Sequence, residues 1–247
     1  MTIPMKPWTY HPSPALSLSS TEQLTVFPRE RDMTHAVLRI LWTVWLRVVL
    51  RLYFQLRIVG HEQLPAACSY VLVANHASHL NGVALSTVVP IRAVHRAFSV
   101  AAKDYFFSSF WRSFFSAVFI NALPFDRVEK KRESLELCAD LLAVSDQVLI
   151  MFPEGTRSLT GAIQPFKQGI GILVAGTPRQ VVPAYIDGAY AAWPKGSRFP
   201  RPRRVRVIIG APLDFAHVPR TPEGFRQVAC DVEAAVRQLT PATHPGA

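Results

Sequence analysis

Cysteine is scarce in this sequence of 247 residues, and the cysteines it has stand far apart. Cys68, Cys138 and Cys230 form no CxxC pair, which argues against a disulfide framework or a zinc site and indicates reduced thiols in a cytosolic setting. The start of the chain lacks a charged segment followed by an apolar core, so we expect no signal peptide. Residues 1–32 carry five prolines and a serine and threonine cluster, and they are expected to form a disordered tail.

Long uncharged apolar runs are also missing. Residues 34–57 are predicted to form one amphipathic helix, but its longest run without charge, Ile40–Leu46, is far short of the ~20 residues that span a bilayer. Trp42 and Trp45 would lie at headgroup depth if this helix rests in a membrane interface, and the alternative is a helix packed on the domain. We interpret residues 33–58 as a membrane-associated helix, peripheral or monotopic, on the cytoplasmic face. One stripe of it carries four arginines: Arg39, Arg47, Arg51 and Arg57.

Acidic side chains are outnumbered, and lysine is rare among the basic ones. The formal net charge is +10, and only six of the 27 basic residues are lysine, whereas 49% of all residues are hydrophobic. A protein that is both basic and apolar favours an anionic membrane surface or a phosphorylated partner. We expect no nucleic-acid partner, because no recognisable nucleic-acid module accompanies the charge.

Strand-like and helix-like patterns alternate along the rest of the chain. Strands are predicted at 70–74, 97–102, 147–152, 181–186 and 204–209, the last of them edge-like, and a short strand followed by a turn is predicted within 120–127. Helices are predicted at 82–89, 105–119, 128–144, 164–175 and from Thr221 onward. This alternation predicts an α/β fold: a single domain over residues 59–240, with a mixed, largely parallel sheet flanked by helices.

Two of the predicted buried strands run straight into polar clusters. The first is followed by Asn75-His76, and histidine can both take and give a proton near neutral pH. The second is followed by Glu154, Gly155, Thr156 and Arg157, in which the guanidinium offers a planar fork for a phosphate. If the two strands are near neighbours, a general base and a cationic anchor face one crevice. Such a site suits a substrate with a phosphate and a hydroxyl to be activated.

These residues resemble the glycerolipid acyltransferases, and more narrowly the PlsC-like 1-acylglycerol-3-phosphate acyltransferases. That family carries an NHxxxxD box and an FPEGTRS box, and residues 152–158 match the second box at every position. The resemblance covers about residues 55–215. Smaller matches accompany it: Lys103 before an aromatic-rich segment, Phe125-Asp126-Arg127, Phe166-Lys167 and Val182-Pro183.

The resemblance implies transfer of a fatty acyl group from acyl-CoA or acyl carrier protein to the free hydroxyl of a lysophospholipid, in the first instance 1-acylglycerol-3-phosphate, to give phosphatidic acid. His76 would act as the general base. No metal is implied, and no cofactor beyond the thioester co-substrate. The implied partners are the thioester donor, the lysophospholipid, the carrier protein and the anionic membrane. The implied substrate-binding residues are Lys103, Arg127, Glu154, Gly155, Thr156, Arg157 and Lys167.

The first box departs from the family pattern, because Asn81 stands where the family has aspartate. An amide can orient the His76 ring but cannot supply the charge that stabilises an imidazolium. Asn81 therefore serves a slower or specialised enzyme, or Asp104 or Asp126 takes over, or turnover is lost and binding kept. His79 is interpreted as a turn residue that contacts solvent or supports the site.

Two alternatives for the function therefore stay open. One is a catalytically weak or silent homologue that binds anionic lipid, and the other is an acyltransferase for another acceptor, such as a lyso-aminolipid. The run 195–206 carries six positive charges and no acid. It is a solvated loop, a contact with anionic lipid or a docking patch for acyl carrier protein.

Overall fold

The computed structural model describes residues 33–66, 68–102, 122–125, 131–143 and 146–241. Several sequence predictions lie outside these residues: the tail 1–32, the helix 105–119, Lys103, Arg127 and the two alternative aspartates, Asp104 and Asp126.

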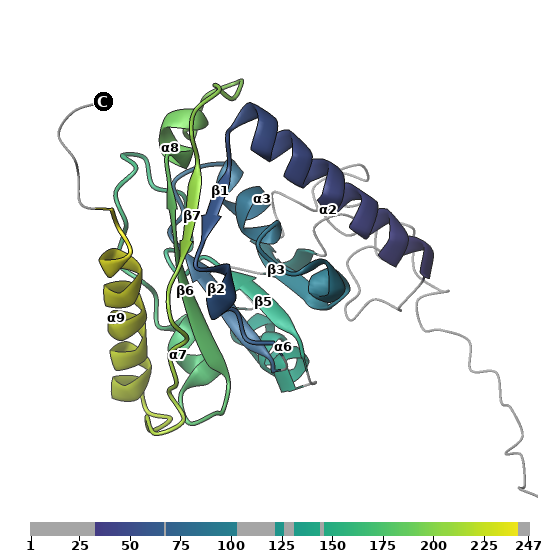
Figure 1. Ribbon diagram of the computed structural model, residues 1–247. Helices are drawn as coiled ribbons and strands as arrows, with labels where there is room; N and C mark the ends of the chain where they lie inside the picture. Colours follow the sequence, from purple (N-terminus) through teal and green to yellow (C-terminus); the bar gives the residue numbers. More distant parts are fainter. Residues whose placement is uncertain (1–32, 67, 103–121, 126–130, 144–145, 242–247) are drawn as a thin grey trace, which may run out of the picture.

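Within the described residues, one seven-stranded sheet organises the chain, in the order β1-β7-β6-β2-β5-β3-β4 (Figure 1). All neighbouring strands run parallel except β6 and β7, so the predicted mixed, largely parallel sheet is confirmed. The strands are β1 (Arg57–Val59), β2 (Tyr70–Ala74), β3 (Ala97–Ala102), β4 (Ala122–Phe125), β5 (Val148–Met151), β6 (Gln180–Asp187) and β7 (Arg206–Ile209).

Helices cover both faces of the sheet, with α9 on one side and α2 and α3 on the other (Figure 1). The α-helices are α2 (Met33–Tyr53), α3 (Leu80–Ser86), α6 (Lys131–Ala143), α7 (Gly169–Val174), α8 (Ala189–Ala192) and α9 (Pro222–Gln238). Two short 3₁₀ helices, η2 (His61–Gln63) and η3 (Ile91–Arg96), complete the described elements.

Strand β2 explains why the sheet is buried on both faces. Val71 and Val73 belong to the core cluster under α6, α7 and α9, whereas Leu72 and Ala74 belong to the cluster under α2 and α3. A strand covered on both faces needs apolar residues at every position rather than at alternate ones. The unbroken run Tyr70–Ala74 is therefore the mark of a central strand, and every residue in it is buried.

The N-terminal helix ends earlier than predicted, and the strand at 204–209 is not at the edge. Gln55 adopts a left-handed backbone conformation with φ 46°, and Leu56 N–H donates back to Leu50 O at 3.1 Å, which closes the helix after Tyr53. The next residues form β1, which pairs with β7 and takes the edge position. Both predictions were wrong because glutamine is not a common signal for a left-handed turn.

Helix α2 turns two of its arginines, Arg39 and Arg47, toward the domain, whereas Arg51 is exposed. Arg39 is only 8% exposed, and Arg47 donates from Nε to Thr87 O at 3.0 Å and from Nη2 to Val89 O at 2.7 Å. Burial lowers the pKa of Arg39 to about 10 and also lowers the pKa of Arg47. Most of the outward side is apolar. Its exposed apolar residues are Val37, Leu38, Leu41, Val44, Trp45, Val48, Leu52 and Tyr53.

None of the helices in the described part of the chain is both long enough and apolar enough to pass through a bilayer.

The close approach of α7 and α9 depends on Gly171. A Cβ at this position would overlap the backbone carbonyl oxygen and Cα of Phe225, whereas a Cβ at Gly169 in the same helix would make ordinary contacts no closer than 3.6 Å. We expect Gly171→Ala to destabilise the fold by at least ~1–3 kcal/mol through overpacking, and Gly169→Ala to be neutral or slightly stabilising. Urea unfolding of both variants measures this difference. Equal stability of the two would contradict the described packing of α7 on α9.

Candidate active site

The two polar clusters leave the same edge of the sheet. Strands β2 and β5 are parallel neighbours, with Val73 opposite Met151, so Asn75-His76 and residues 152–158 follow adjacent strand ends. The condition set by the sequence, that the two strands lie close together, is met. In open α/β sheets, ligands bind outside the carboxyl ends of the strands.

Asn75 fixes the point where β2 ends. Its Oδ1 accepts a hydrogen bond from Ile186 N–H at 2.8 Å, and its Nδ2 donates to Ile186 O at 3.2 Å. The buried amide therefore continues the β2–β6 ladder by one side chain, after the backbone pairing has reached Ala74 and Ala184. His76 follows this anchored residue directly.

The backbone of His76 is bonded to the second cluster on both sides. His76 N–H donates to Glu154 Oε1 at 2.7 Å, and His76 O accepts from Ser158 N–H at 2.7 Å. The imidazole ring stacks on Phe152, with centroids 4.3 Å apart and planes inclined by 19°. These contacts hold the half-buried histidine against the loop 152–158.

Glu154 is buried, with 2% of its surface exposed, and its carboxyl accepts a hydrogen bond from the His76 backbone rather than facing solvent. Burial raises the pKa of its carboxyl to about 7, and hydrogen bonds from the backbone of His76 and Gln164 and the charge of Arg237 oppose that rise. In the part of the chain that the structure describes, Oε2 of Glu154 is buried without a hydrogen-bond partner. The contact that this carboxyl makes therefore positions the backbone of His76.

Gly155 and Lys167 lie together, as a substrate-binding pair would require. Gly155 has φ +73°, and a Cβ there would lie 2.6 Å from Lys167 Nζ, so the lysine side chain passes directly over the glycine backbone. Lys167 N–H donates to Pro153 O at 3.0 Å, and the lysine is exposed. Thr156, at the tip of the same loop, is exposed as well.

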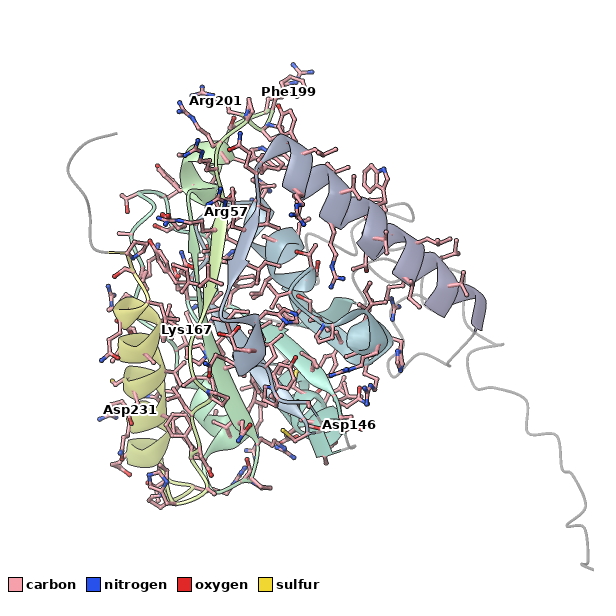
Figure 2. All side chains as sticks on the ribbon, viewed as in Figure 1. Arg57, Asp146, Lys167, Phe199, Arg201 and Asp231 are labelled. Atoms are coloured by element: carbon pink, nitrogen blue, oxygen red, sulfur yellow. The ribbon has the colours of Figure 1, made fainter. Side chains whose placement is uncertain are left out.

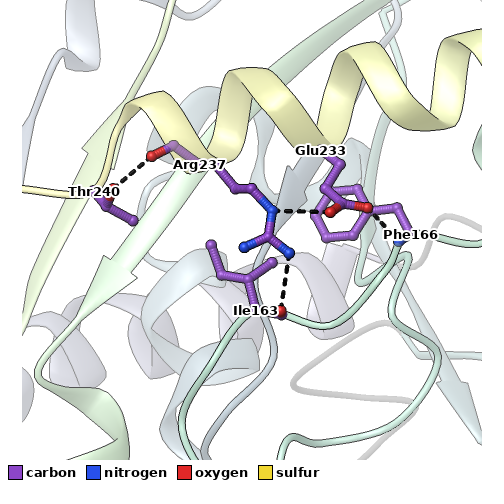
Figure 3. A network of polar contacts seen from close by, with 5 residues as sticks. All are labelled: Ile163, Phe166, Glu233, Arg237 and Thr240. Atoms are coloured by element: carbon purple, nitrogen blue, oxygen red, sulfur yellow. Dashed lines mark hydrogen bonds and ion pairs between the residues drawn. The ribbon is translucent and has the colours of Figure 1, made fainter.

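The segment before Lys167 is held by α9 (Figure 3). Glu233 Oε2 accepts from Phe166 N–H at 2.8 Å, and Arg237 Nη2 donates to Ile163 O at 3.0 Å. Arg237 also pairs with Glu233 Oε1 at 2.9 Å. The C-terminal helix, which the resemblance does not cover, therefore positions a predicted substrate-binding residue.

Arg157 lies against His79, a partner that the sequence pattern does not indicate. Nη1 of Arg157 contacts both ring nitrogens of His79, and the indole of Trp193 lies 5.1 Å from that ring. Burial, and then the positive charge of Arg157, lower the pKa of His79. A neutral imidazole can accept a hydrogen bond from a guanidinium. Trp193 was missed altogether, because nothing near it in the sequence points to a site.

Asn81 uses its amide as a donor. Nδ2 of Asn81 donates to Asn75 O at 2.9 Å, and the residue is fully buried near the start of α3. Among the described residues, its Oδ1 is buried without a hydrogen-bond partner. An aspartate carboxylate at this position would be unable to make the bond to the Asn75 carbonyl.

A family model described as Acyltransferase matches residues 55–187, which is more than half of the chain. The chain belongs to the Acyltransferase family. This confirms the resemblance, and the matched segment of the acyltransferase runs from just after α2 to the end of β6 and includes both polar clusters.

Curated relatives of this acyltransferase carry the name 1-acyl-sn-glycerol-3-phosphate acyltransferase. The one from Bacillus subtilis is 28% identical over 70% of this chain and 83% of its own length. The one from Cocos nucifera is 28% identical over 58% of this chain, and the chain spans only 45% of that relative's length. The crystal structure of PlsC from Thermotoga maritima shares the fold, with a TM-score of 0.64 and 21% identity over 90% of this chain and 88% of that one.

The buried carboxyl of Glu154 makes the stability of the acyltransferase depend on pH. Its pKa rises from 4.5 to about 7 in the folded protein, so the native state binds more protons than the unfolded state between these values. The contribution of Glu154 to stability therefore falls as pH rises through this window. We expect Glu154→Gln, whose amide oxygen can still accept the His76 N–H bond, to become more stable relative to wild type by on the order of 1–3 kcal/mol from pH 4.5 to 7.5.

Thermal or urea unfolding of wild type and variant across this range measures the difference. Glu62→Gln, which neutralises an exposed carboxylate, is the matched control and should track the wild type. A difference between Glu154→Gln and wild type that does not change with pH would argue against the raised pKa.

Proposed function

We propose that this protein is a membrane-associated O-acyltransferase that moves a fatty acyl group from acyl-CoA or acyl carrier protein to the free hydroxyl of 1-acylglycerol-3-phosphate. The observation that supports this most is the pair of 2.7 Å hydrogen bonds that join His76 to the loop 152–158. They bring the candidate base and the loop that carries Arg157 to one edge of the sheet. The names of the curated relatives favour the same reaction.

His76 is the general base in this proposal. Its imidazole takes the hydroxyl proton as the oxygen attacks the thioester carbonyl, and the proton passes to the thiolate when the C–S bond breaks. No covalent acyl-enzyme is needed. The stack on Phe152 keeps the ring in one orientation, and the bonds to Glu154 and Ser158 keep its backbone in place.

Arg157 and Lys167 are the proposed phosphate ligands, with Gly155 and Thr156 lining the approach. The guanidinium suits a bidentate contact with a phosphomonoester, and the lysine supplies a second charge beside a backbone without a Cβ. His79, whose ring lies beside Trp193, restricts the movement of the guanidinium. Arg127 and Lys103 stay proposed ligands on the resemblance alone.

The catalytic test uses His76→Ala in an assay that follows free thiol released from acyl-CoA with lysophosphatidic acid. We expect His76→Ala to reduce kcat about 10²–10⁴-fold, the usual contribution of general acid–base catalysis. Equal rates above the uncatalysed rate would contradict His76 as the base, and rates at the uncatalysed level in both proteins would instead indicate a lipid-binding homologue without turnover.

The Asn81→Asp variant tests, in the same assay, whether a negative charge at position 81 increases turnover, separately from its effect on stability. The carboxylate loses the bond to Asn75 O, so we expect a loss of about 1–3 kcal/mol in stability. It also supplies a negative charge for the imidazolium, so we expect kcat to rise. Asn81→Ala, which loses the same bond without adding charge, is the control, and a rise in kcat there would contradict a role for the charge.

The phosphate test uses Arg157→Ala and Arg157→Lys with lysophosphatidic acid and with uncharged monoacylglycerol. We expect Arg157→Ala to lower kcat/KM about 10–100-fold for the phosphorylated acceptor only, since a charge-assisted bond contributes ~1.5–3 kcal/mol, and Arg157→Lys to lie between. An equal loss with both acceptors would remove Arg157 from phosphate binding.

His79→Phe extends this test to the residue behind the arginine. The variant keeps a ring beside Trp193 but has no acceptor for Arg157. We expect a higher KM for lysophosphatidic acid with kcat nearly unchanged. As the pH falls below the ordinary histidine pKa of 6.5, we also expect KM to rise less than in wild type, because protonated His79 would repel Arg157. The phosphate of the acceptor also titrates near pH 6 and affects both proteins alike. The measurement is therefore the difference between the KM–pH profiles of wild type and His79→Phe.

Helix α2 is the proposed membrane contact. Eight apolar residues of this helix are exposed on the side away from the domain, with Leu41 62% and Leu52 77% exposed. An apolar face of this width next to a basic protein surface is typical of a helix that lies in the membrane interface. Membrane association would bring the enzyme to both the acceptor and the product.

A further inference from the structure

The basic segment of residues 195–204 lies at the same edge of the sheet as His76. Strand β6 is parallel to β2, and β7 returns antiparallel to β6, so the connection between them leaves the carboxyl edge. The connection is also tied to the first cluster: Ser78 Oγ–H donates to Trp193 O at 2.6 Å, and Ser78 forms a β-bridge with Pro194.

The tip of this segment displays an aromatic ring among cations. Phe199 is 69% exposed, and the guanidinium of Arg198 lies 5.5 Å from its ring centroid. Among the described residues, these cations form no ion pair with an acid. The exposed cations are Lys195, Arg198, Arg201, Arg203 and Arg204.

The exposed ring is held in place by internal hydrogen bonds. Trp193 Nε1–H donates to Ser197 O at 3.0 Å, Ser197 Oγ–H donates to Phe199 O at 3.0 Å, and Arg201 N–H donates to Ala192 O at 2.8 Å. A backbone that is fixed in this way keeps a large apolar side chain in water. Such an arrangement favours a surface that covers the ring.

The segment continues the exposed face of α2. Tyr53 Oη–H donates to Pro200 O at 3.3 Å, and Arg204 Nε donates to Gln55 Oε1 at 3.0 Å. Figure 2 shows Phe199 and Arg201 beside the end of α2, at the top of the view. The apolar side of the helix and the cationic tip therefore form neighbouring parts of one surface.

We propose that residues 195–204 are a second membrane contact, with Phe199 inserted at the interface and the arginines bound to the phosphates of anionic lipids. Together with α2, this contact turns the edge that carries His76 toward the bilayer. This inference rests on the proposed membrane association of the enzyme. An aromatic ring flanked by arginines, next to an apolar helix face, matches a membrane interface, where anionic headgroups lie over an apolar acyl-chain region. An acidic carrier protein would account for the charges but not for the exposed apolar face.

The test compares binding of the full chain to vesicles of phosphatidylcholine alone and of phosphatidylcholine with phosphatidylglycerol. Each basic residue near an anionic surface strengthens binding about fivefold, so we expect Arg198→Gln/Arg201→Gln to weaken binding to the anionic vesicles roughly 25-fold. The control Arg132→Gln/Arg226→Gln removes two exposed arginines from α6 and α9 and should stay within about twofold of wild type.

The aromatic tip is tested separately from the charge. We expect Phe199→Ser to weaken binding to both kinds of vesicle and Phe199→Trp to restore it, because tryptophan favours the membrane interface. Leu41→Ser/Trp45→Ser in α2 should also weaken binding to both kinds of vesicle. If neither the arginine pair nor Phe199 affects binding, the proposed second contact is wrong.

Two further measurements distinguish membrane binding from catalysis and from the docking of a carrier protein. Activity with a short-chain lysophosphatidate that stays dissolved should be unchanged in the Arg198→Gln/Arg201→Gln variant. If His76→Ala loses this activity and the arginine variant keeps it, the proposed catalysis stands whatever the vesicle experiment shows. If the arginine variant binds vesicles normally but has a higher KM for acyl carrier protein and not for acyl-CoA, the segment is a carrier-docking surface and the membrane proposal is overturned.

Discussion

The bonds between the His76 backbone and the loop 152–158 hold the candidate site together. One of them ends on a buried carboxyl, Glu154, and the other on Ser158 N–H. Both depend on β2 and β5 being parallel neighbours, which places residues about 80 positions apart in the chain at adjacent strand ends. A shift of β5 by one residue would turn its side chains to the opposite faces of the sheet and separate these partners.

Much of the fold could be predicted, because its central strands are buried on both faces and therefore appear as unbroken apolar runs. Tyr70–Ala74 is the clearest example. The edge of the sheet could not be predicted in this way. Strand β1 has only three residues, of which Arg57 and Val59 are exposed, so neither length nor alternation distinguishes it from the end of the preceding helix. The turn that separates the two depends on Gln55, which carries no local signal for it.

The site was predictable where a short motif carries its chemistry and not where its geometry comes from distant residues. The loop 152–158 could be assigned from sequence because seven consecutive residues matched. His79 could be interpreted only as a turn residue, because its partner Arg157 is 78 positions away and its neighbour Trp193 lies farther still. Glu154 was expected to bind substrate, whereas its burial and its bond to His76 N–H indicate support of the candidate base. Sequence identifies a residue type, but burial decides what that residue can reach.

The amphipathic pattern of helix α2 does not by itself determine which side of the helix faces the domain. Four arginines on a stripe suggest a solvated side, yet Arg47 donates to the carbonyls of Thr87 and Val89, just beyond the end of α3, where backbone acceptors lack helical partners. Those acceptors offset the burial of a guanidinium, whose five donors need partners. With Arg39 and Arg47 turned toward the domain and Arg51 left exposed, apolar residues make up most of the outward side of the helix. The membrane contact proposed for this helix therefore depends on the acceptors that Arg47 finds inside the domain as well as on the hydrophobicity of the outward side.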